Sequence, residues 1–172
     1  MKCNICCGKA IENTDFCRNC LVRAVERRAR KRLSKIGITG DCRVLVVNDD
    51  SCEGQVNAFL IKKLVTATKN IKHAKNLGKN SRYDFVSFAD TADMAAERFL
   101  GLMLDSSLKR CQKHAIKLLR GSLSKEVAAY AKIKRIKYAK KNKLSDIALL
   151  LERLERYKGT KFALAKLSER VK

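Results

Sequence analysis

The stretch RVLVVNDDSCEGQVNAFL, from Arg43 to Leu60, constrains the fold more than any other part of the chain. It opens with Val44–Val47, an apolar run rich in β-branched residues and bounded by polar ones, which predicts a buried strand. A polar turn follows, and then apolar residues recur at helical spacing. A strand that enters a helix through a tight turn is the arrangement in which α/β proteins bind phosphate groups. The sequence therefore predicts an α/β fold with this turn at its centre.

The turn itself has the wrong charge for a phosphate. Phosphate-binding loops use glycines so that backbone N–H groups can approach the ligand, and they keep a positive potential. Here Asp49, Asp50 and Glu53 supply three carboxylates, and the glycine, Gly54, comes at the end of the turn. Three carboxylates facing a triphosphate would repel it. We therefore expect no ATP binding at this turn.

The charge balance of the chain predicts a polyanionic partner. Its 172 residues are enough for one compact domain with a small appendage. Lys and Arg number 39 against 17 acidic residues, which gives a formal charge of +22. This excess favours nucleic acid, bound through its phosphates, over the alternative of a generally cationic surface. The sequence has no apolar run of about 18 residues and no signal-peptide pattern, so we expect neither membrane insertion nor export, but a cytoplasmic protein.

Eight cysteines in such a chain favour metal binding or structural thiols over disulfides. Cys3 and Cys6 form one C-x-x-C pair, and Cys17 and Cys20 form a second. Two such pairs predict a tetrahedral four-thiolate site, for which zinc is the expected ion. Cys7 could replace Cys6 in another register. A closed shell of four thiolates leaves no position for a substrate, so we expect one zinc ion with a structural role.

Two segments concentrate the positive charge. Residues 21–35 have apolar residues at helical spacing and basic residues over the remainder, with only Glu26 as a local counter-charge, and residues 132–143 are a lysine-rich run. The bland interpretation is a solvated charged face. We expect RNA contacts instead, mainly to phosphates and RNA shape, because aromatic residues are few. The predicted RNA-binding residues are Arg23, Arg27, Arg28, Arg30, Lys31, Arg32, Lys134, Arg135, Lys137, Lys140 and Lys141.

A second strand–turn–helix unit is predicted downstream. Residues 83–89 are an apolar run typical of a strand, and they lead through a turn into a helix for which Thr91 is the expected N-cap. Residues 70–82 are expected to form a loop with a frayed helical piece, and residues 116–119 are a candidate third strand. The chain then divides into a zinc finger (1–24), a basic helix and linker (25–40), an α/β core (41–121) and a basic, mainly helical segment (122–172).

Several segments together carry a resemblance to one known family. The cysteine pairs MKCNIC and DFCRNC come first, then a basic helix and the turn DDSCEG, then FADTADMAAE, LLRGSLSKEVAAYAKIKRIKY and KGTKF. In this order they resemble the tRNA 2-thiolation proteins of the PP-loop ATPase superfamily. Those proteins carry a two-knuckle zinc finger, an SGGxDS pyrophosphate loop, a G-H-x-x-D-D motif and a P-G-T-K-F motif. The resemblance implies a reduced PP-loop domain of the adenine nucleotide alpha hydrolase-like type, with a short parallel sheet and a helical C-terminus.

The departures from the family pattern are as informative as the matching segments. Asp50 and Ser51 replace both glycines of the SGG triplet, and of the Asp-Asp pair only Asp93 is retained. The family's central C-x-x-C and late cysteine have no counterpart, so no iron–sulfur cluster and no catalytic residue are expected. The short span between the two strand–turn–helix units suggests the loss of an internal block, which would leave the two strands as sheet neighbours. The degenerate nucleotide loop comprises Asp49, Asp50, Ser51, Glu53 and Gly54, together with Asp93.

The pattern is most similar to the non-catalytic partner subunit of the eukaryotic/archaeal-type cytoplasmic tRNA 2-thiolation complex. This resemblance implies a pseudoenzyme that binds tRNA and pairs with an active thiolase, or with a second copy of itself, in thiolation of a wobble uridine. Two alternatives stay open. One is a stand-alone zinc-finger protein that binds RNA or the ribosome. The other is an active ATP-dependent tRNA 2-thiouridine synthetase, which would require the carboxylate-rich turn to bind ATP.

Overall fold

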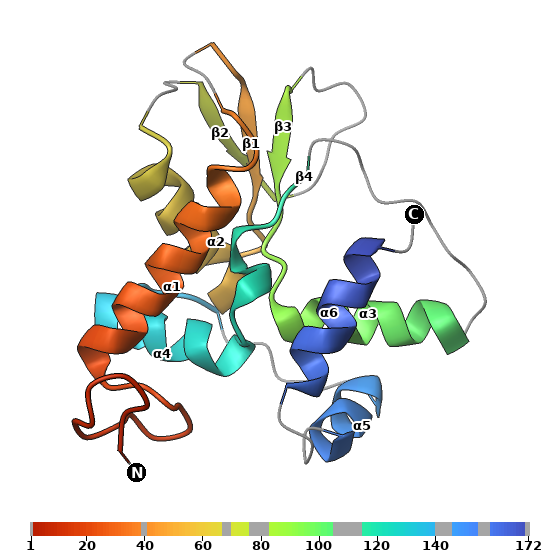
Figure 1. Cartoon of the computed structure of the whole chain (residues 1–172). Coiled ribbons are helices and arrows are strands. Elements are labelled where there is room, and N and C mark those ends of the chain that lie inside the picture. The colour runs from red at the N-terminus through yellow and green to blue at the C-terminus, as the bar shows by residue number, and fades with distance from the viewer. Residues whose placement is uncertain are drawn as a thin grey trace.

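The computed structural model describes residues 2–38, 41–66, 70–75, 83–104, 115–139, 146–154 and 159–170 (Figure 1). Helices and strands alternate through the first two thirds of the chain, and helices follow. The elements are α1 (Arg18–Leu33), β1 (Val44–Val47), α2 (Cys52–Leu64), β2 (Ile71–Ala74), β3 (Phe85–Ser87), α3 (Ala92–Leu104), β4 (Ala115–Ile116), the 3-10 helix η1 (Leu118–Gly121), α4 (Ser124–Lys134), α5 (Asp146–Leu154) and α6 (Thr160–Arg170).

The sheet is parallel, with strand order β2-β1-β3-β4. Val44, Leu45 and Val46 of the predicted first strand are all buried, as expected for an inner strand of a parallel sheet. The predicted pairing of β1 with β3 is confirmed. The connection after β1 leads to one edge of the sheet, and the connection after β3 leads to the other. Ligands of such open sheets bind at this reversal, outside the carboxyl ends of the two strands. In this chain the β1–α2 and β3–α3 turns emerge there.

Some predicted elements differ from those observed. Residues 70–82 were expected to form a loop, but Ile71–Ala74 pairs with β1 as an edge strand. The helix expected to continue to about residue 69 ends at Leu64, and α1 begins at Arg18, before the predicted start. The candidate third strand is only Ala115–Ile116, after which the chain turns into η1.

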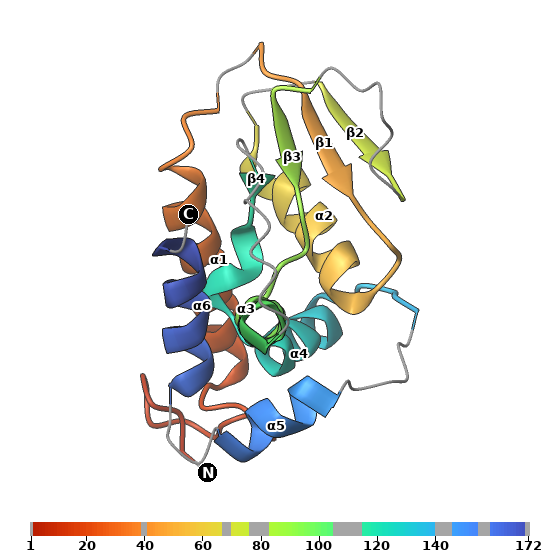
Figure 2. The same cartoon turned by 90° about the vertical axis from the view of Figure 1, so that its right-hand side faces the viewer.

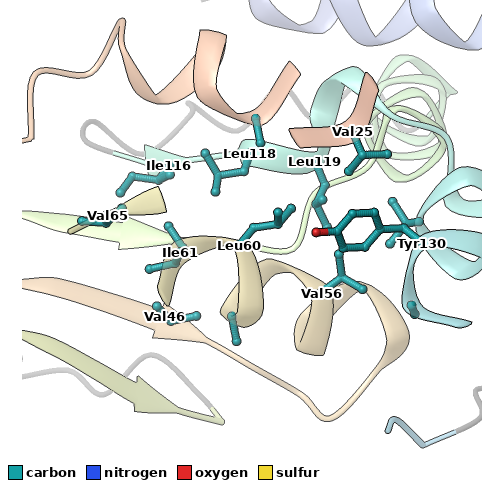
Figure 3. Packing of buried hydrophobic residues seen from close by; sticks show 14 of the residues in the cluster. Val25, Val46, Val56, Leu60, Ile61, Val65, Ile116, Leu118, Leu119 and Tyr130 are labelled. Atoms are coloured by element: carbon teal, nitrogen blue, oxygen red, sulfur yellow. The ribbon is translucent and has the colours of Figure 1, made fainter. Parts of the chain in front are cut away.

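One core joins the sheet to the helices. α1 and α2 lie on the same side of the sheet (Figures 1 and 2). Figure 3 shows the packing between them: Ile61 of α2 lies near Val46 of β1, and Leu119 and Val25 approach the ring of Tyr130 from α4. These side chains are at most 1% exposed. Their burial fixes α1, and with it the N-terminal cysteines, to the sheet.

A second, smaller cluster joins α3 to α6, which lie side by side in Figure 1. Ala92 and Ala95 of α3 pack against Ala165 of α6, and Phe162 covers them. Phe99 of α3 is also buried, whereas Met103 of the same helix is 59% exposed. Among the described residues, no helix combines the length and the apolar character needed to cross a membrane.

Candidate functional site

The four predicted metal ligands converge at the N-terminus. The Sγ atoms of Cys3, Cys6, Cys17 and Cys20 all lie within 4.8 Å of one another, and those of Cys6 and Cys17 are 3.5 Å apart. Cys7 is exposed and lies outside this group, so the register through Cys6 is the one observed. Four sulfur atoms at this spacing can surround one metal ion.

The chain around the cysteines is held by its own backbone. The N–H of Cys3 donates to the carbonyl of Gly8, and the N–H of Asn4 donates to the carbonyl of Asp15. Buried Thr14 donates its hydroxyl to the carbonyls of Ile11 and Phe16. These bonds close both cysteine-bearing loops and hold the sulfur atoms close to one another.

The second cysteine pair is continuous with α1. Cys17 is the N-cap of this helix, and Cys20 lies buried in its first turn. Further along, the Arg28 guanidinium lies 5.7 Å from the centre of the Phe16 ring and forms an ion pair of 2.7 Å with Glu126 of α4. The cysteine cluster, α1 and α4 therefore form one connected unit.

The thiols differ in acidity. Hydrogen bonds from the backbone N–H groups of Cys17, Cys6 and Ile5 lower the pKa of Cys3 to about 6. Hydrogen bonds from the backbone of Cys20 and from the Cys6 side chain lower the pKa of Cys17. The hydrogen bond to Cys17 raises the pKa of Cys20 to about 12, and Cys6 and burial act in the same direction. The chain itself thus favours only part of a four-thiolate set, and a cation is needed to ionise the remainder.

The β1–α2 turn is filled by its own polar atoms. Ser51 is the N-cap of α2: its hydroxyl accepts a hydrogen bond of 3.1 Å from the Gly54 N–H and donates one of 2.5 Å to Asp49 Oδ1. The Ser51 N–H donates to the same Asp49 oxygen. A Cβ at Gly54 would lie 2.6 Å from Asn48 Oδ1 and 2.8 Å from Asp49 Oδ1. Side-chain oxygens therefore cover the start of α2, where a phosphate loop would present free N–H groups.

Asp50 is also engaged within the chain. It has a φ of +61°, a backbone conformation that glycine adopts most easily. Its carboxylate accepts a hydrogen bond from Gln55 Nε2 at 3.2 Å and lies 3.2 Å from Lys75 Nζ, and its carbonyl accepts from the Ala139 N–H at 2.9 Å. The expectation of three carboxylates that simply repel a ligand is therefore incomplete, because Asp49 and Asp50 act as internal hydrogen-bond acceptors. Glu53 is half-buried, and its charge adds to burial in raising the pKa of Cys52 to about 11.

Asp93 connects the second turn to the C-terminal helices. Its Oδ2 accepts a hydrogen bond from the Ser124 N–H at the start of α4, and its Oδ1 lies 2.9 Å from Lys161 Nζ. Lys161 belongs to the KGTKF segment, so two motifs that are far apart in the sequence meet here. Nearby Asp90 is buried and forms ion pairs with Arg98 and with Lys117.

The basic residues of α1 fall into two groups. Arg23, Arg27 and Lys31 are exposed and have no acidic partner among the described residues, and Arg30 is exposed with Glu26 at 3.6 Å. Arg28 and Arg32 are half-buried, and they pair with acidic residues distant in sequence. Arg28 lies 2.7 Å from Glu126, and Arg32 lies 3.0 Å from Glu169. Arg32 is therefore not fully exposed, and Glu126 and Glu169 add to Glu26, the only acidic residue of this segment, as partners of the α1 arginines.

The second basic segment approaches the first. Arg135 and Lys137 are exposed, Lys134 is half-buried, and Lys140 and Lys141 lie outside the described residues. Burial opposes ionisation of Glu26, but hydrogen bonds from Lys63 and Tyr130 and the charges of Lys63 and Lys134 give a lowered pKa. Because Arg30 and Lys134 both act on this carboxylate, α1 and α4 present their cations on adjoining surfaces.

Sequence reasoning missed that cations from another segment lie against α1. Lys35, Lys117 and Arg120 line a hollow of about 560 Å³ together with Arg28, Lys31 and Arg32. Lys117 and Arg120 belong to the β4–η1 segment, for which the sequence predicts a candidate strand at residues 116–119 and a resemblance from Leu118 onward, but no role for its cations. The basic composition indicated an excess of charge, but no local pattern indicates that this segment faces α1.

No protein-family model matches the sequence, and no curated protein matches it either. Its fold is similar to that of the U34-tRNA thiolase NcsA from Methanococcus maripaludis, a protein whose structure was solved with its 4Fe–4S cluster. The TM-score is 0.76 at 17% sequence identity, and the match covers 99% of this chain and 87% of the thiolase chain. This likeness shows that the chain shares the α/β fold of that protein.

Proposed function

We propose that this protein is a non-catalytic tRNA-binding member of the tRNA 2-thiolation type, acting beside an active thiolase. The observation that carries the proposal is the β1–α2 turn, where Asp49 and Ser51 cover the start of α2 on the fold of a tRNA thiolase. An ATP phosphate would have to displace these side chains and approach Asp50 and Glu53 as well. The chain keeps the architecture and the positive charge, whereas the place for the nucleotide is filled.

The cysteine cluster holds one structural zinc ion in this proposal. Zn–S bonds of about 2.3 Å place tetrahedral ligands about 3.8 Å apart, and the observed sulfur atoms lie within 4.8 Å of one another. An iron–sulfur cluster with four irons needs more widely spaced thiolates, because each thiolate binds a different iron. The spacing therefore supports a single ion. The bound ion would fix the loops against α1 and supply the positive charge that the four thiolates lack.

Exposed apolar side chains support a protein partner. The helix α5 is nine residues long, and three of its leucines are exposed. The exposed fractions are 46% for Leu149, 44% for Leu150 and 38% for Leu154. Copurification from the native host, followed by mass spectrometry of the bound proteins and RNA, tests this part of the proposal. A thiolase subunit and tRNA in the same complex are expected. Recovery of ribosomal proteins instead would favour the stand-alone RNA-binding alternative.

A salt titration of tRNA binding tests the RNA contacts. Arg23→Gln/Arg27→Gln removes two exposed cations without breaking a known ion pair, so the fold should be unaffected. The slope of log affinity against log salt should flatten by about one unit for each lost phosphate contact. A matched control is Lys62→Gln/Lys72→Gln, on α2 and β2. Lys63 is unsuitable as a control because it is bound to Glu26 at 2.6 Å. If both double variants weaken tRNA binding equally, the localised RNA site is wrong, and only a diffuse electrostatic attraction between the protein and tRNA remains.

A further inference from the structure

The hollow beside α1 has the chemistry of an anion site. It lies between the C-terminal half of α1, the β4–η1 segment and the end of α6, and Figure 1 shows η1 between these two helices. Six cations line it: Arg28, Lys31, Arg32, Lys35, Lys117 and Arg120. It shares no residue with the β1–α2 turn.

Internal acids neutralise only part of this charge. Glu126 pairs with Arg28, Asp90 pairs with Lys117, and Glu169 pairs with both Arg32 and Arg120. Three carboxylates are thus the acidic partners of four of the six cations, and of the three only Glu169 lines the hollow. Lys31 and Lys35 are exposed and have no acidic partner among the described residues. Like charges held this close together repel one another, and a bound anion would relieve that repulsion.

Glu169 shows where an anion can be held. Its Oε1 lies 3.0 Å from Arg32 on α1 and 3.5 Å from Nε of Arg120 on η1. One carboxylate oxygen is thus shared between guanidinium groups from two elements. A phosphate has more acceptor oxygens than a carboxylate, and guanidinium groups bind such oxygens in pairs.

Arg120 supplies the second, independent observation. It is 7% exposed, and its guanidinium donates to Ser168, but Nε makes no hydrogen bond within the described chain. A buried guanidinium is costly unless its donors are used. Its Nε faces Glu169, on the lining of the hollow, so an anion bound there could accept the unused hydrogen bond.

We propose that this hollow is a phosphate-binding site, in which a phosphate displaces the Glu169 carboxylate from between Arg32 and Arg120. The occupant is a backbone phosphate of the bound RNA, an assignment that rests on the proposed function, whereas the phosphate site itself does not. Glu169 then competes with the ligand for these two arginines.

Titration with inorganic pyrophosphate and, separately, with tRNA tests the site on the full chain. Glu169→Gln removes the competing charge, so pyrophosphate should bind roughly five- to tenfold more tightly. Glu152→Gln, an exposed acid on α5, is the matched control for net charge and should change binding less than twofold or so. Lys31→Gln/Lys35→Gln should weaken binding by about tenfold, and Lys62→Gln/Lys72→Gln should not. Melting curves verify that all variants fold.

The outcomes separate the two proposals. If Glu169→Gln and Glu152→Gln have equal effects on pyrophosphate, the phosphate site is wrong, whatever tRNA does. If the hollow variants change pyrophosphate affinity but leave tRNA affinity unchanged, the site holds a small phosphate and RNA is not its occupant. If wild type binds pyrophosphate at this site but binds no tRNA, the phosphate site stands and the proposed function fails.

Discussion

The N-terminal cysteine cluster and the β1–α2 turn solve the same electrostatic problem in opposite ways. Both bring several potential anions together within a few residues. In the cluster, the chain lowers the pKa of Cys3 and Cys17 but raises that of Cys20, so full ionisation requires an added cation. In the turn, the carboxylates of Asp49 and Asp50 already accept hydrogen bonds from neighbouring residues. In our proposal the first region is completed by a metal ion, whereas the second is satisfied by its own side chains.

Removal of the metal should have the largest effect. A strong chelator, or Cys17→Ser, should lower the melting temperature by roughly 10 °C, because binding to a closed thiolate site contributes directly to folding. α1 begins at this site, so it should become sensitive to protease. Cys7→Ser is the control and should have no effect, since Cys7 lies outside the cluster. Elemental analysis should find one zinc ion per chain, and iron with sulfide in its place would contradict the assignment.

Gly54→Ala should destabilise the β1–α2 turn, which is filled by its own polar side chains. The added Cβ would overlap Asn48 Oδ1 and Asp49 Oδ1, which are fixed by hydrogen bonds to the turn backbone. Overpacking of this kind costs about 1–3 kcal/mol, partly offset by the helix preference of Ala of about 1 kcal/mol. Gly101→Ala in α3 is the matched control. Its Cβ would meet Ile147 at 3.4 Å, an ordinary contact, so the free energy of unfolding should stay the same or rise. Equal effects in denaturant titrations would show that the turn is not tightly filled.

Ser51→Ala should have a smaller effect. The Ser51 hydroxyl accepts from the Gly54 N–H and donates to Asp49, and loss of such an N-cap costs about 1 kcal/mol. Ser34→Ala at the end of α1 provides the comparison, because its hydroxyl bonds only the Lys31 carbonyl at the surface. The free energy of unfolding of the Ser34→Ala variant should differ from that of the wild type by less than about 0.5 kcal/mol. Indistinguishable unfolding curves for the two variants would contradict the role of Ser51 as the N-cap of α2.

Mg-ATP should have no effect at all. Because the polar atoms of the turn already have partners, millimolar nucleotide should produce neither heat in calorimetry nor a shift in melting temperature. A micromolar dissociation constant with release of pyrophosphate would contradict the non-catalytic assignment and revive the synthetase alternative.

Sequence reasoning succeeded where one local pattern decides the structure. The apolar run at β1 and the spacing of the two cysteine pairs each specify a structure within a few residues. It missed β2, because Ile71–Ala74 is an edge strand of mixed polarity that depends on the neighbouring β1 for its hydrogen bonds. Charge alone suggested that Asp49 excludes ATP, but its hydrogen bonds to Ser51 depend on turn geometry that composition does not encode.

The partners of the α1 arginines could not be predicted for a different reason. Glu126 and Glu169 are separated from Arg28 and Arg32 by most of the chain, and only the packing of α4 and α6 brings them close. Helical periodicity correctly placed Val25 and Ala29 inside. It cannot tell which of the remaining positions face solvent and which face another element.

The parallel register of the sheet determines when the protein can fold as it is synthesised. Val44 pairs with Ile71 and Phe85, and Val86 pairs with Ala115, so β1 and β3 must each wait for a partner made later. The cysteine loops span only residues 3–20, so in the proposed zinc-bound protein they would bind their ion before any strand of the sheet has its partner. α1 would then wait on a metal-stabilised base, with the apolar side chain of Val25 uncovered until α4 is complete. The bound ion would thus hold the cysteine loops and the start of α1 in place while the ribosome makes the sheet.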